Sequence, residues 1–184
     1  MMKYWRTGLF CFVLVAPVAS AANQDPATSM QSSVDDFREF SRVMQGRWIS
    51  EIIWITDWPG YGERGDTATG YAEYQIAEDG NVLTGREYQG GGSITSVAYY
   101  DPGERQIVQH WVASSGGAMH FVYYKQNGEW HYNLLGTTVD EEEIAGSGIR
   151  YIEDQGQTQR FTGEWSIDGE MLDPLRDSFR RLGD

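Results

Sequence analysis

The stretch from residue 44 to residue 58 constrains the fold of this chain more than any other. It reads Met-Gln-Gly-Arg-Trp-Ile-Ser-Glu-Ile-Ile-Trp-Ile-Thr-Asp-Trp, and it follows a helix-like segment. Aromatic and β-branched residues of this kind favour extended strands. We therefore interpret residues 47–57 as the first strand of a sheet that the rest of the chain must complete.

Apolar and polar residues continue to alternate with a period of two almost to the C-terminus, and turn sequences separate the runs. The Asn127-Gly128 pair is the strongest of these signals, because it favours a two-residue hairpin turn. The expected strands are residues 47–57, 67–77, 82–88, 93–100, 106–113, 118–125, 130–138, 143–152, 159–167 and 177–182. Short connections between about ten strands predict an all-β fold, a closed antiparallel up-and-down barrel wide enough to be hollow.

A single helix is expected before the first strand. Ser33 followed by Asp36 is a capping-box pattern with Asp in place of Glu. Phe37, Phe40 and Met44 fall on one face at helical spacing, and a glycine follows where helices often end. These features predict a short helix over residues 34–44 that caps one end of the barrel.

The N-terminus has the pattern of a secretory signal peptide. Lys3 and Arg6 precede an apolar run over residues 8–18, and Ala19-Ser20-Ala21 fits a cleavage site. We expect residues 1–21 to be removed, residues 22–32 to form a disordered polar leader, and residues 33–184 to form one domain. The mature protein would then be exported, to a bacterial periplasm or beyond the cell, without a membrane segment.

Charge and cysteine content narrow the classes of partner. Removal of residues 1–21 would take Lys3, Arg6 and Cys11, the sole cysteine, and would change the net charge from −13 to −15. Strong negative charge disfavours binding to nucleic acid or to an anionic membrane. Without cysteine, the mature domain must be stabilised by its core alone.

The opening Gly46-Arg47-Trp48 resembles the Gly-x-Trp start of calycin-type barrels, which include lipocalins, fatty-acid-binding proteins and nitrobindin-like domains. The order of short motifs along the chain is similar to that of exported bacterial calycin-like domains of unknown function. After this opening come Pro59-Gly60, Tyr99-Tyr100-Asp101 and Trp165-Ser166-Ile167-Asp168-Gly169. The resemblance covers residues 34–182. It implies the barrel and is silent about activity, since fold and function are separable.

The resemblance also implies structural roles. In lipocalins the opening tryptophan packs under an arginine of the last strand. Trp48, which follows Gly46 by two residues, would be this tryptophan. Arg180 would pack over its ring, with Arg181 or Arg160 as alternatives. Nitrobindin-like domains bind haem through a late histidine, and no histidine follows His131. We therefore expect no haem or other cofactor.

Three histidines lie on consecutive expected strands, so we tested them as a metal site. The hairpin register places His131 opposite Tyr124, and His120 lies four residues away along its strand, about 13 Å at ~3.3 Å per residue. One ion cannot bridge that distance. His110 approaches His120 only if the turn at residues 114–117 has the favourable register, and no metal site is expected.

An apolar cavity lined by aromatic rings is the alternative to a fully packed core. The expected ligand-binding residues are Trp54, Tyr99, His110, Trp111, His120, Phe121, Tyr123, Trp130 and Tyr132. Four carboxylates occupy mid-strand positions, and one that faced inward would have a raised pKa: Glu51, Glu73, Glu87 and Glu164.

Three functions follow from these alternatives. The first is an exported carrier or binding domain for a small apolar or aromatic molecule, held under the loop at residues 58–66. The second is an accessory domain that has a packed interior and acts through its outer surface. The third is a barrel enzyme that uses a buried glutamate or histidine for proton transfer. The oligomeric state stays open.

Overall fold

The computed structural model describes residues 30–183. The expected signal peptide and residues 22–29 of the expected leader lie outside the described residues. Met30 to Ser32 are described, and Ser32 is buried against the barrel. Its N–H donates to the carbonyl of Arg105 at 2.7 Å and its hydroxyl to the carbonyl of Tyr123 at 3.1 Å. The packed domain therefore includes Ser32, one residue before the expected start.

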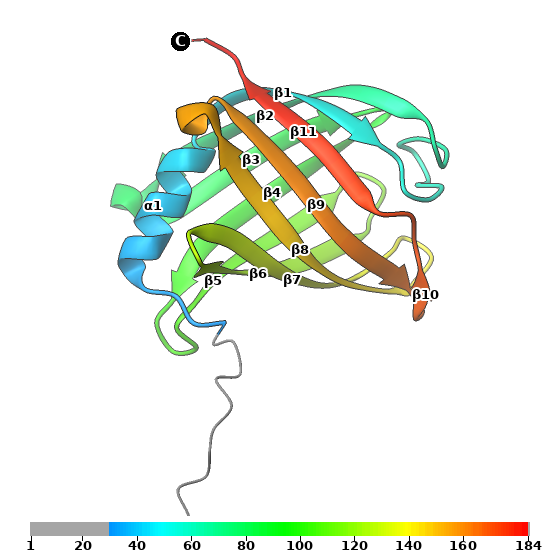
Figure 1. Cartoon of the computed structure of the whole chain (residues 1–184). Coiled ribbons are helices and arrows are strands. Elements are labelled where there is room, and N and C mark those ends of the chain that lie inside the picture. The colour runs from blue at the N-terminus through cyan, green and yellow to red at the C-terminus, as the bar shows by residue number, and fades with distance from the viewer. Residues whose placement is uncertain (1–29, 184) are drawn as a thin grey trace, which may run out of the picture.

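Ten antiparallel strands form a closed up-and-down barrel, as expected (Figure 1). They are β1 (Gly46–Ile53), β2 (Thr67–Ala77), β3 (Val82–Gln89), β4 (Gly92–Asp101), β5 (Gln106–Ala113), β6 (Ala118–Gln126), β7 (Glu129–Thr137), β8 (Glu143–Glu153), β9 (Thr158–Ile167) and β11 (Leu175–Arg181). A two-residue strand, β10 (Glu170–Met171), pairs antiparallel with the end of β9. The last strand pairs with the first through Trp48 opposite Arg181 and Glu51 opposite Ser178, which closes the sheet.

Local turn chemistry sets the strand boundaries. Asn127 and Gly128 both have positive φ, 52° and 86°, as the type I′ hairpin turn requires. That turn pairs Gln126 with Glu129 and His131 with Tyr124, in the expected register. The first strand is shorter than expected, because the chain turns at Trp54. The backbone of Trp54 there bonds to Gly65 and Asp66, the last residues of the loop that leads into β2.

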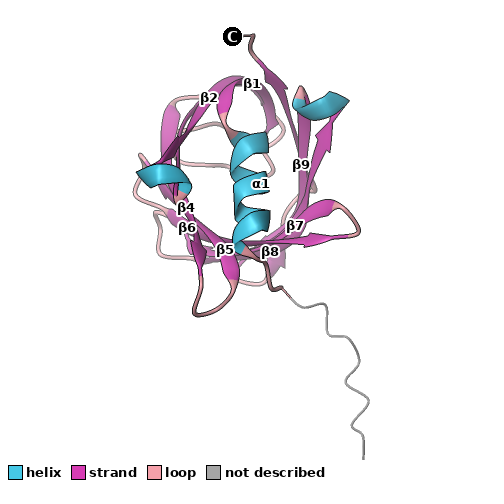
Figure 2. Cartoon of the chain, turned by 90° about the vertical axis from the view of Figure 1, so that its left-hand side faces the viewer, coloured by secondary structure: helices cyan, strands magenta, loops and turns pink. Residues whose placement is uncertain are grey.

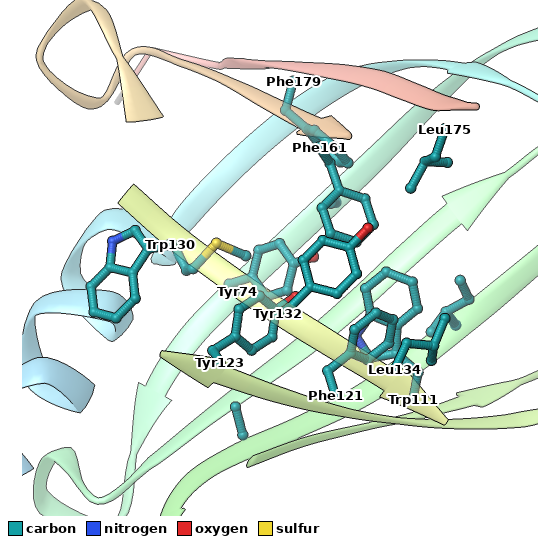
Figure 3. Close-up of a cluster of buried hydrophobic side chains, with 14 of the residues drawn as sticks. Tyr74, Trp111, Phe121, Tyr123, Trp130, Tyr132, Leu134, Phe161, Leu175 and Phe179 are labelled. Carbon is teal, nitrogen blue, oxygen red and sulfur yellow. The ribbon is translucent and has the colours of Figure 1, made fainter. Parts of the chain in front are cut away.

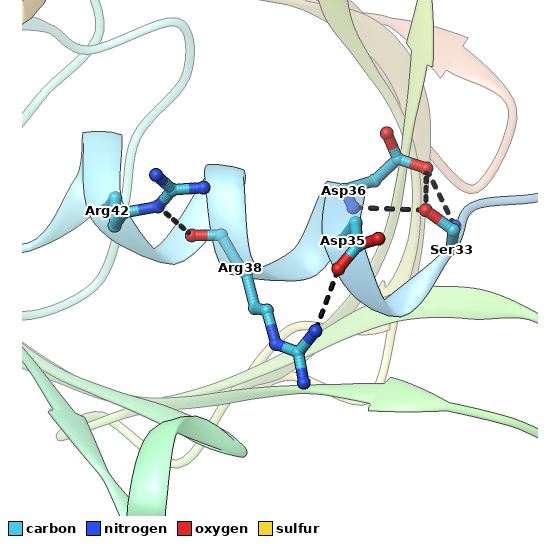
Figure 4. Close-up of polar contacts among 5 residues, drawn as sticks. All are labelled: Ser33, Asp35, Asp36, Arg38 and Arg42. Atoms are coloured by element: carbon cyan, nitrogen blue, oxygen red, sulfur yellow. Dashed lines mark hydrogen bonds and ion pairs between the residues drawn. The ribbon is translucent and has the colours of Figure 1, made fainter.

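The helix α1 (Val34–Met44) lies across one end of the barrel (Figure 2). Its N-terminus carries the expected capping box. The Ser33 hydroxyl accepts from the Asp36 N–H, and the Asp36 carboxylate accepts from the Ser33 N–H at 2.7 Å (Figure 4). Phe37, Phe40 and Met44 are buried on the side that faces the barrel interior. Among the described residues, no helix is long and apolar enough to cross a membrane.

Arg181, rather than Arg180, lies over Trp48 where the helix meets the barrel. The Arg181 guanidinium is 4.2 Å from the Trp48 ring centroid, and it donates to the carbonyls of Val43 at 2.9 Å and Gly156 at 3.0 Å. Arg180 is exposed because neighbouring residues of a strand point to opposite faces. Gly46 has a φ of 120°, and a Cβ there would collide with the Arg181 side chain.

Candidate functional site

The end of the barrel nearer α1 is filled by aromatic side chains (Figure 3). Phe40 of the helix packs on Tyr123, with ring centroids 4.7 Å apart, and on Trp130 at 5.3 Å. Deeper in, Tyr132 stacks on Phe161 at 4.7 Å. This half of the interior is therefore a packed core. An accessory domain that acts through its outer surface would have such packing throughout its interior.

The opposite end contains a cavity of about 310 Å³. Side chains of several strands and of the loop at residues 54–66 surround it, and most of them are apolar. Seven of them are aromatic: Trp54, Trp58, Tyr61, Trp111, Phe161, Trp165 and Phe179. Ile52, Ile94, Met119 and Leu175 add aliphatic surface. A concave, ring-lined space of this size is typical of a site for a small organic molecule.

The loop at residues 54–66 covers one side of the cavity and is fixed to the barrel at two points. The Tyr61 hydroxyl donates to the carbonyl of Ser93 at 2.6 Å and accepts from the N–H of Ser114 at 3.1 Å. Arg64 makes a bidentate ion pair with Asp173 in the connection between β10 and β11, at 2.7 and 2.6 Å. This pairing lowers the pKa of the exposed Asp173 carboxyl. The loop is thereby tied to both sides of the mouth.

Between the packed end and the cavity, the barrel encloses a polar network. Glu87 is 1% exposed and accepts hydrogen bonds from the Tyr74 hydroxyl at 2.6 Å and from Gln89 at 2.8 Å. Burial raises the pKa of Glu87, an effect that the Tyr74 hydrogen bond and the charge of Arg150 oppose. Glu87 is the one of the four expected carboxylates that is buried.

Arg150 supplies the positive charge of this network. It is 1% exposed, donates to Gln159 at 2.9 Å, and its guanidinium lies 4.3 Å from the ring centroid of Phe161 and 5.2 Å from that of Phe179. It also interacts electrostatically with Tyr74, Tyr123 and Glu87. Since both phenylalanine rings line the cavity, they separate the guanidinium from it.

Asp177 is the buried carboxyl that reaches the cavity. It alternates with Leu175 and Phe179 on the inner face of β11 and is 8% exposed. Its Oδ1 accepts a hydrogen bond from the N–H of Ile53 at 3.2 Å, at the point where β1 and β11 diverge. Burial raises the pKa of Asp177 to about 7, against the opposing effects of this hydrogen bond and of Arg150.

The nine expected ligand-binding residues separate into three groups. Trp54 and Trp111 line the cavity. Phe121, Tyr123, Trp130 and Tyr132 are buried in the packed core and do not line it. The remaining three point outward: Tyr99, His110 and His120. These three side chains lie away from the cavity, because adjacent residues of a strand face opposite sides, so His110 and Trp111 cannot both point inward, nor can His120 and Phe121.

On the outer face, His110 and His120 pair directly across β5 and β6, with ring centroids 4.7 Å apart. The turn at residues 114–117 thus has the register that brings them together. Partial burial and the neighbouring His110 lower the pKa of His120. Within residues 30–183, no three His, Cys, Asp or Glu side chains form a group suited to a metal ion.

Sequence reasoning missed most of the cavity wall. Asp177 was placed at the start of the last strand, and its spacing of two from Phe179 could have shown that both side chains share a face. Trp58 and Tyr61 belong to a loop, where no periodic pattern of residues indicates the side to which a side chain points. Trp165 stands out in the sequence only as the first residue of the stretch 165–169 that resembles calycin-like domains.

Comparison with known proteins supports the architecture alone. A solved structure with a similar fold is that of Rv2717c from M. tuberculosis, at a TM-score of 0.52 and 13% sequence identity, covering 80% of this chain and 98% of that one. The sequence matches no protein-family profile. It also matches no curated protein. At this level of identity, the likeness concerns the barrel and carries no information about activity.

Proposed function

We infer that this protein is an exported carrier or binding protein for a small apolar or aromatic molecule, held in the cavity beneath the loop at residues 54–66. The observation that supports this function is the concave, ring-lined space of about 310 Å³. Ligand sites in proteins measure ~300 to 1,000 Å³, so a compact molecule of one or two rings suits it. A domain acting through its outer surface alone would have no need of an interior cavity at one end.

Proton-transfer catalysis is the second candidate, and Asp177 is the observation that favours it. A carboxyl with a pKa of about 7 inside a ligand-sized cavity suits a general acid or base. The histidines do not contribute, because His110 and His120 lie on the outer face. A carrier releases its ligand unchanged, whereas an enzyme converts it, so mass analysis of a bound compound before and after incubation separates the two.

The calycin-like class and export belong to the same proposal. The Gly46–Trp48 opening, with an arginine of the last strand over the tryptophan, supports a calycin-like barrel. The pattern of residues 1–21 supports export. The intact mass of protein purified from its own host tests export, because cleavage after Ala21 would leave Ala22 as the first residue.

Binding can be tested with a matched pair of variants in adjacent positions of β5. Ala113 lines the cavity, whereas Val112 is 56% exposed on the outer face. We expect the mature protein to enhance the fluorescence of the uncharged probe N-phenyl-1-naphthylamine. Ala113→Phe should abolish the enhancement by filling the cavity, and Val112→Phe should leave it unchanged.

Native mass spectrometry of protein from its own host gives an independent readout. A retained small molecule in the wild-type protein, absent from Ala113→Phe, would support the carrier function. Equal probe fluorescence in both variants, together with a spectrum free of bound compounds, would contradict it.

A further inference from the structure

The charged side chains around the cavity all carry the same sign. Asp57, Asp140, Glu142 and Asp177 line it, and no lysine, arginine or histidine belongs to the described wall. A carboxylate or phosphate ligand would therefore enter a negative environment with no cationic partner in contact. Aromatic faces, by contrast, attract cations through their negative quadrupole. The wall combines two features that both favour positive charge.

Asp177 has one oxygen more than its structural role requires. Oδ1 accepts the N–H of Ile53, which has no ladder partner where β1 and β11 diverge. Within the described residues no protein group donates to Oδ2, and because this oxygen is not one of the fully buried atoms without a partner, it is accessible from the cavity that the side chain lines. A neutral asparagine could accept the Ile53 N–H equally well. The wall of the barrel thus explains an acceptor at position 177 and leaves the carboxylate's charge unexplained.

The buried charges inside the barrel do not balance. Three charged side chains of the described chain are buried: Glu87, Arg150 and Asp177. Arg150 interacts with both Glu87 and Asp177, but its single positive charge can offset only one of the two carboxylates. One negative charge is then in excess in a medium of low dielectric, which is costly unless a carboxylate takes up a proton or meets a cation, and Asp177 is the carboxylate that a cation in the cavity can reach.

We propose that the ligand of this cavity is a small apolar or aromatic amine whose ammonium group pairs with Asp177 while its rings or methylenes contact the aromatic wall. This inference rests on the proposed binding function and names the chemical class of the ligand. An ammonium supplies both missing elements, a donor for Oδ2 and a charge that balances the interior. The acidic residues Asp57, Asp140 and Glu142 at the cavity wall attract the cation toward the mouth.

The experiment uses three molecules of similar size that differ in charge: 2-phenylethylamine, 2-phenylethanol and 3-phenylpropionate. Their affinities for the mature protein are measured by calorimetry, with Asp177→Asn and Glu51→Gln as the variants. Glu51→Gln is the matched control, because it removes one carboxylate from the exposed face of β1, opposite Ser178. We expect wild type to bind the amine about tenfold or more tightly than the alcohol, with the carboxylate weakest.

Asp177→Asn should weaken the binding of the amine about tenfold or more and leave the affinity for 2-phenylethanol unchanged. Unchanged binding of the alcohol also shows that the variant is folded.

The pH dependence of amine binding is a second readout. Protons compete with the amine for Asp177, so affinity should fall from about pH 8 to about pH 5 in wild type and stay level in Asp177→Asn. Arg150, Glu87 and Tyr132, the titratable groups that interact with Asp177, are present in both proteins.

The outcomes separate this inference from the function on which it rests. Equal affinity for amine and alcohol, or no loss in Asp177→Asn, overturns the amine assignment and leaves a neutral-ligand carrier. Tightest binding of 3-phenylpropionate also overturns it. If no member of the series and no uncharged naphthylamine probe binds, the cavity is not a binding site and both proposals fail.

Discussion

At the scale of the single residue, Asp177 should make the stability of the barrel depend on pH. Its carboxyl has a pKa of about 7 in the folded protein and ~3.9 when unfolded, so between these values the folded state holds a proton that the unfolded state releases. The free energy of unfolding should therefore fall as pH rises through this window, by a contribution on the order of 4 kcal/mol. Asp177→Asn, which keeps an acceptor for Ile53, should lack that contribution.

Urea denaturation at a series of pH values between about 4 and 8 measures the difference. The two proteins should have similar stability near pH 4, and Asp177→Asn should be the more stable near pH 8. Glu87, whose pKa is also raised, is present in both proteins, so its contribution differs only through its electrostatic interaction with Asp177. Parallel curves for the two proteins would show that Asp177 titrates normally and that its burial costs nothing.

The sequence alone could not show which side chains of the site face the interior of the barrel. Along most amphipathic strands the apolar set marks the interior, but this barrel encloses Glu87, Gln109 and Arg150, all of them 1% exposed or less. Conversely, Val112 and Leu135 are exposed on the outside, at 56% and 63%. Polarity therefore fails as a guide to direction on strands with mixed faces. Tyr99, His110 and His120 lie on the outer face although each was expected at the interior wall.

At the scale of the element, the junction between α1 and the barrel should depend on Arg181. Its guanidinium covers Trp48 and donates to carbonyls at the end of the helix, Val43 and Gln45, and to Gly156. Arg181→Met should lower the free energy of unfolding by about 2 to 3 kcal/mol, because it removes the three hydrogen bonds to these carbonyls and the cation–π contact.

Arg180→Met is the matched control, since Arg180 is the exposed neighbour on the same strand. It should change stability by less than about 0.5 kcal/mol. Thermal unfolding followed by tryptophan fluorescence compares the two variants directly. A larger loss from Arg180→Met than from Arg181→Met would mean that the helix is held by other contacts.

The elements themselves were predictable because their signals are local. The helix was expected over residues 34–44 and runs Val34–Met44, since its cap, its apolar face and its terminating glycine lie within a few residues of one another. Turn sequences fixed most strand ends in the same way. The end of β1 at Ile53 differs from the expected end because pairing with β11 stops at Glu51 and the backbone of Trp54 bonds only to the end of the loop before β2, at Gly65 and Asp66. No pattern within the strand itself reports that contact.

At the scale of the whole molecule, closure of the barrel rests on its shortest strand pairing. β1 and β11 share four registered pairs, Trp48 with Arg181 through Glu51 with Ser178, whereas β8 and β9 share ten. Beyond Glu51 the two strands separate, and the Asp177 side chain takes the place of the next ladder bond. This divergence lies beside the cavity, since Ile52, Leu175 and Asp177 all line it. The seam is therefore the part of the wall that should open most readily.

Amide hydrogen exchange, read by mass spectrometry, should detect this opening. Peptides covering Ile52 and Ile53 on β1 and Leu175 and Arg176 on β11 should exchange faster than those covering β2 and β3, because fewer ladder bonds must break. A bound ligand should slow exchange at the seam and change β8 least, because no residue of β8 lines the cavity. Equal protection around the whole sheet would mean that the barrel opens only by global unfolding. Ligand entry would then be confined to the mouth beneath the loop that Arg64 and Asp173 hold in place.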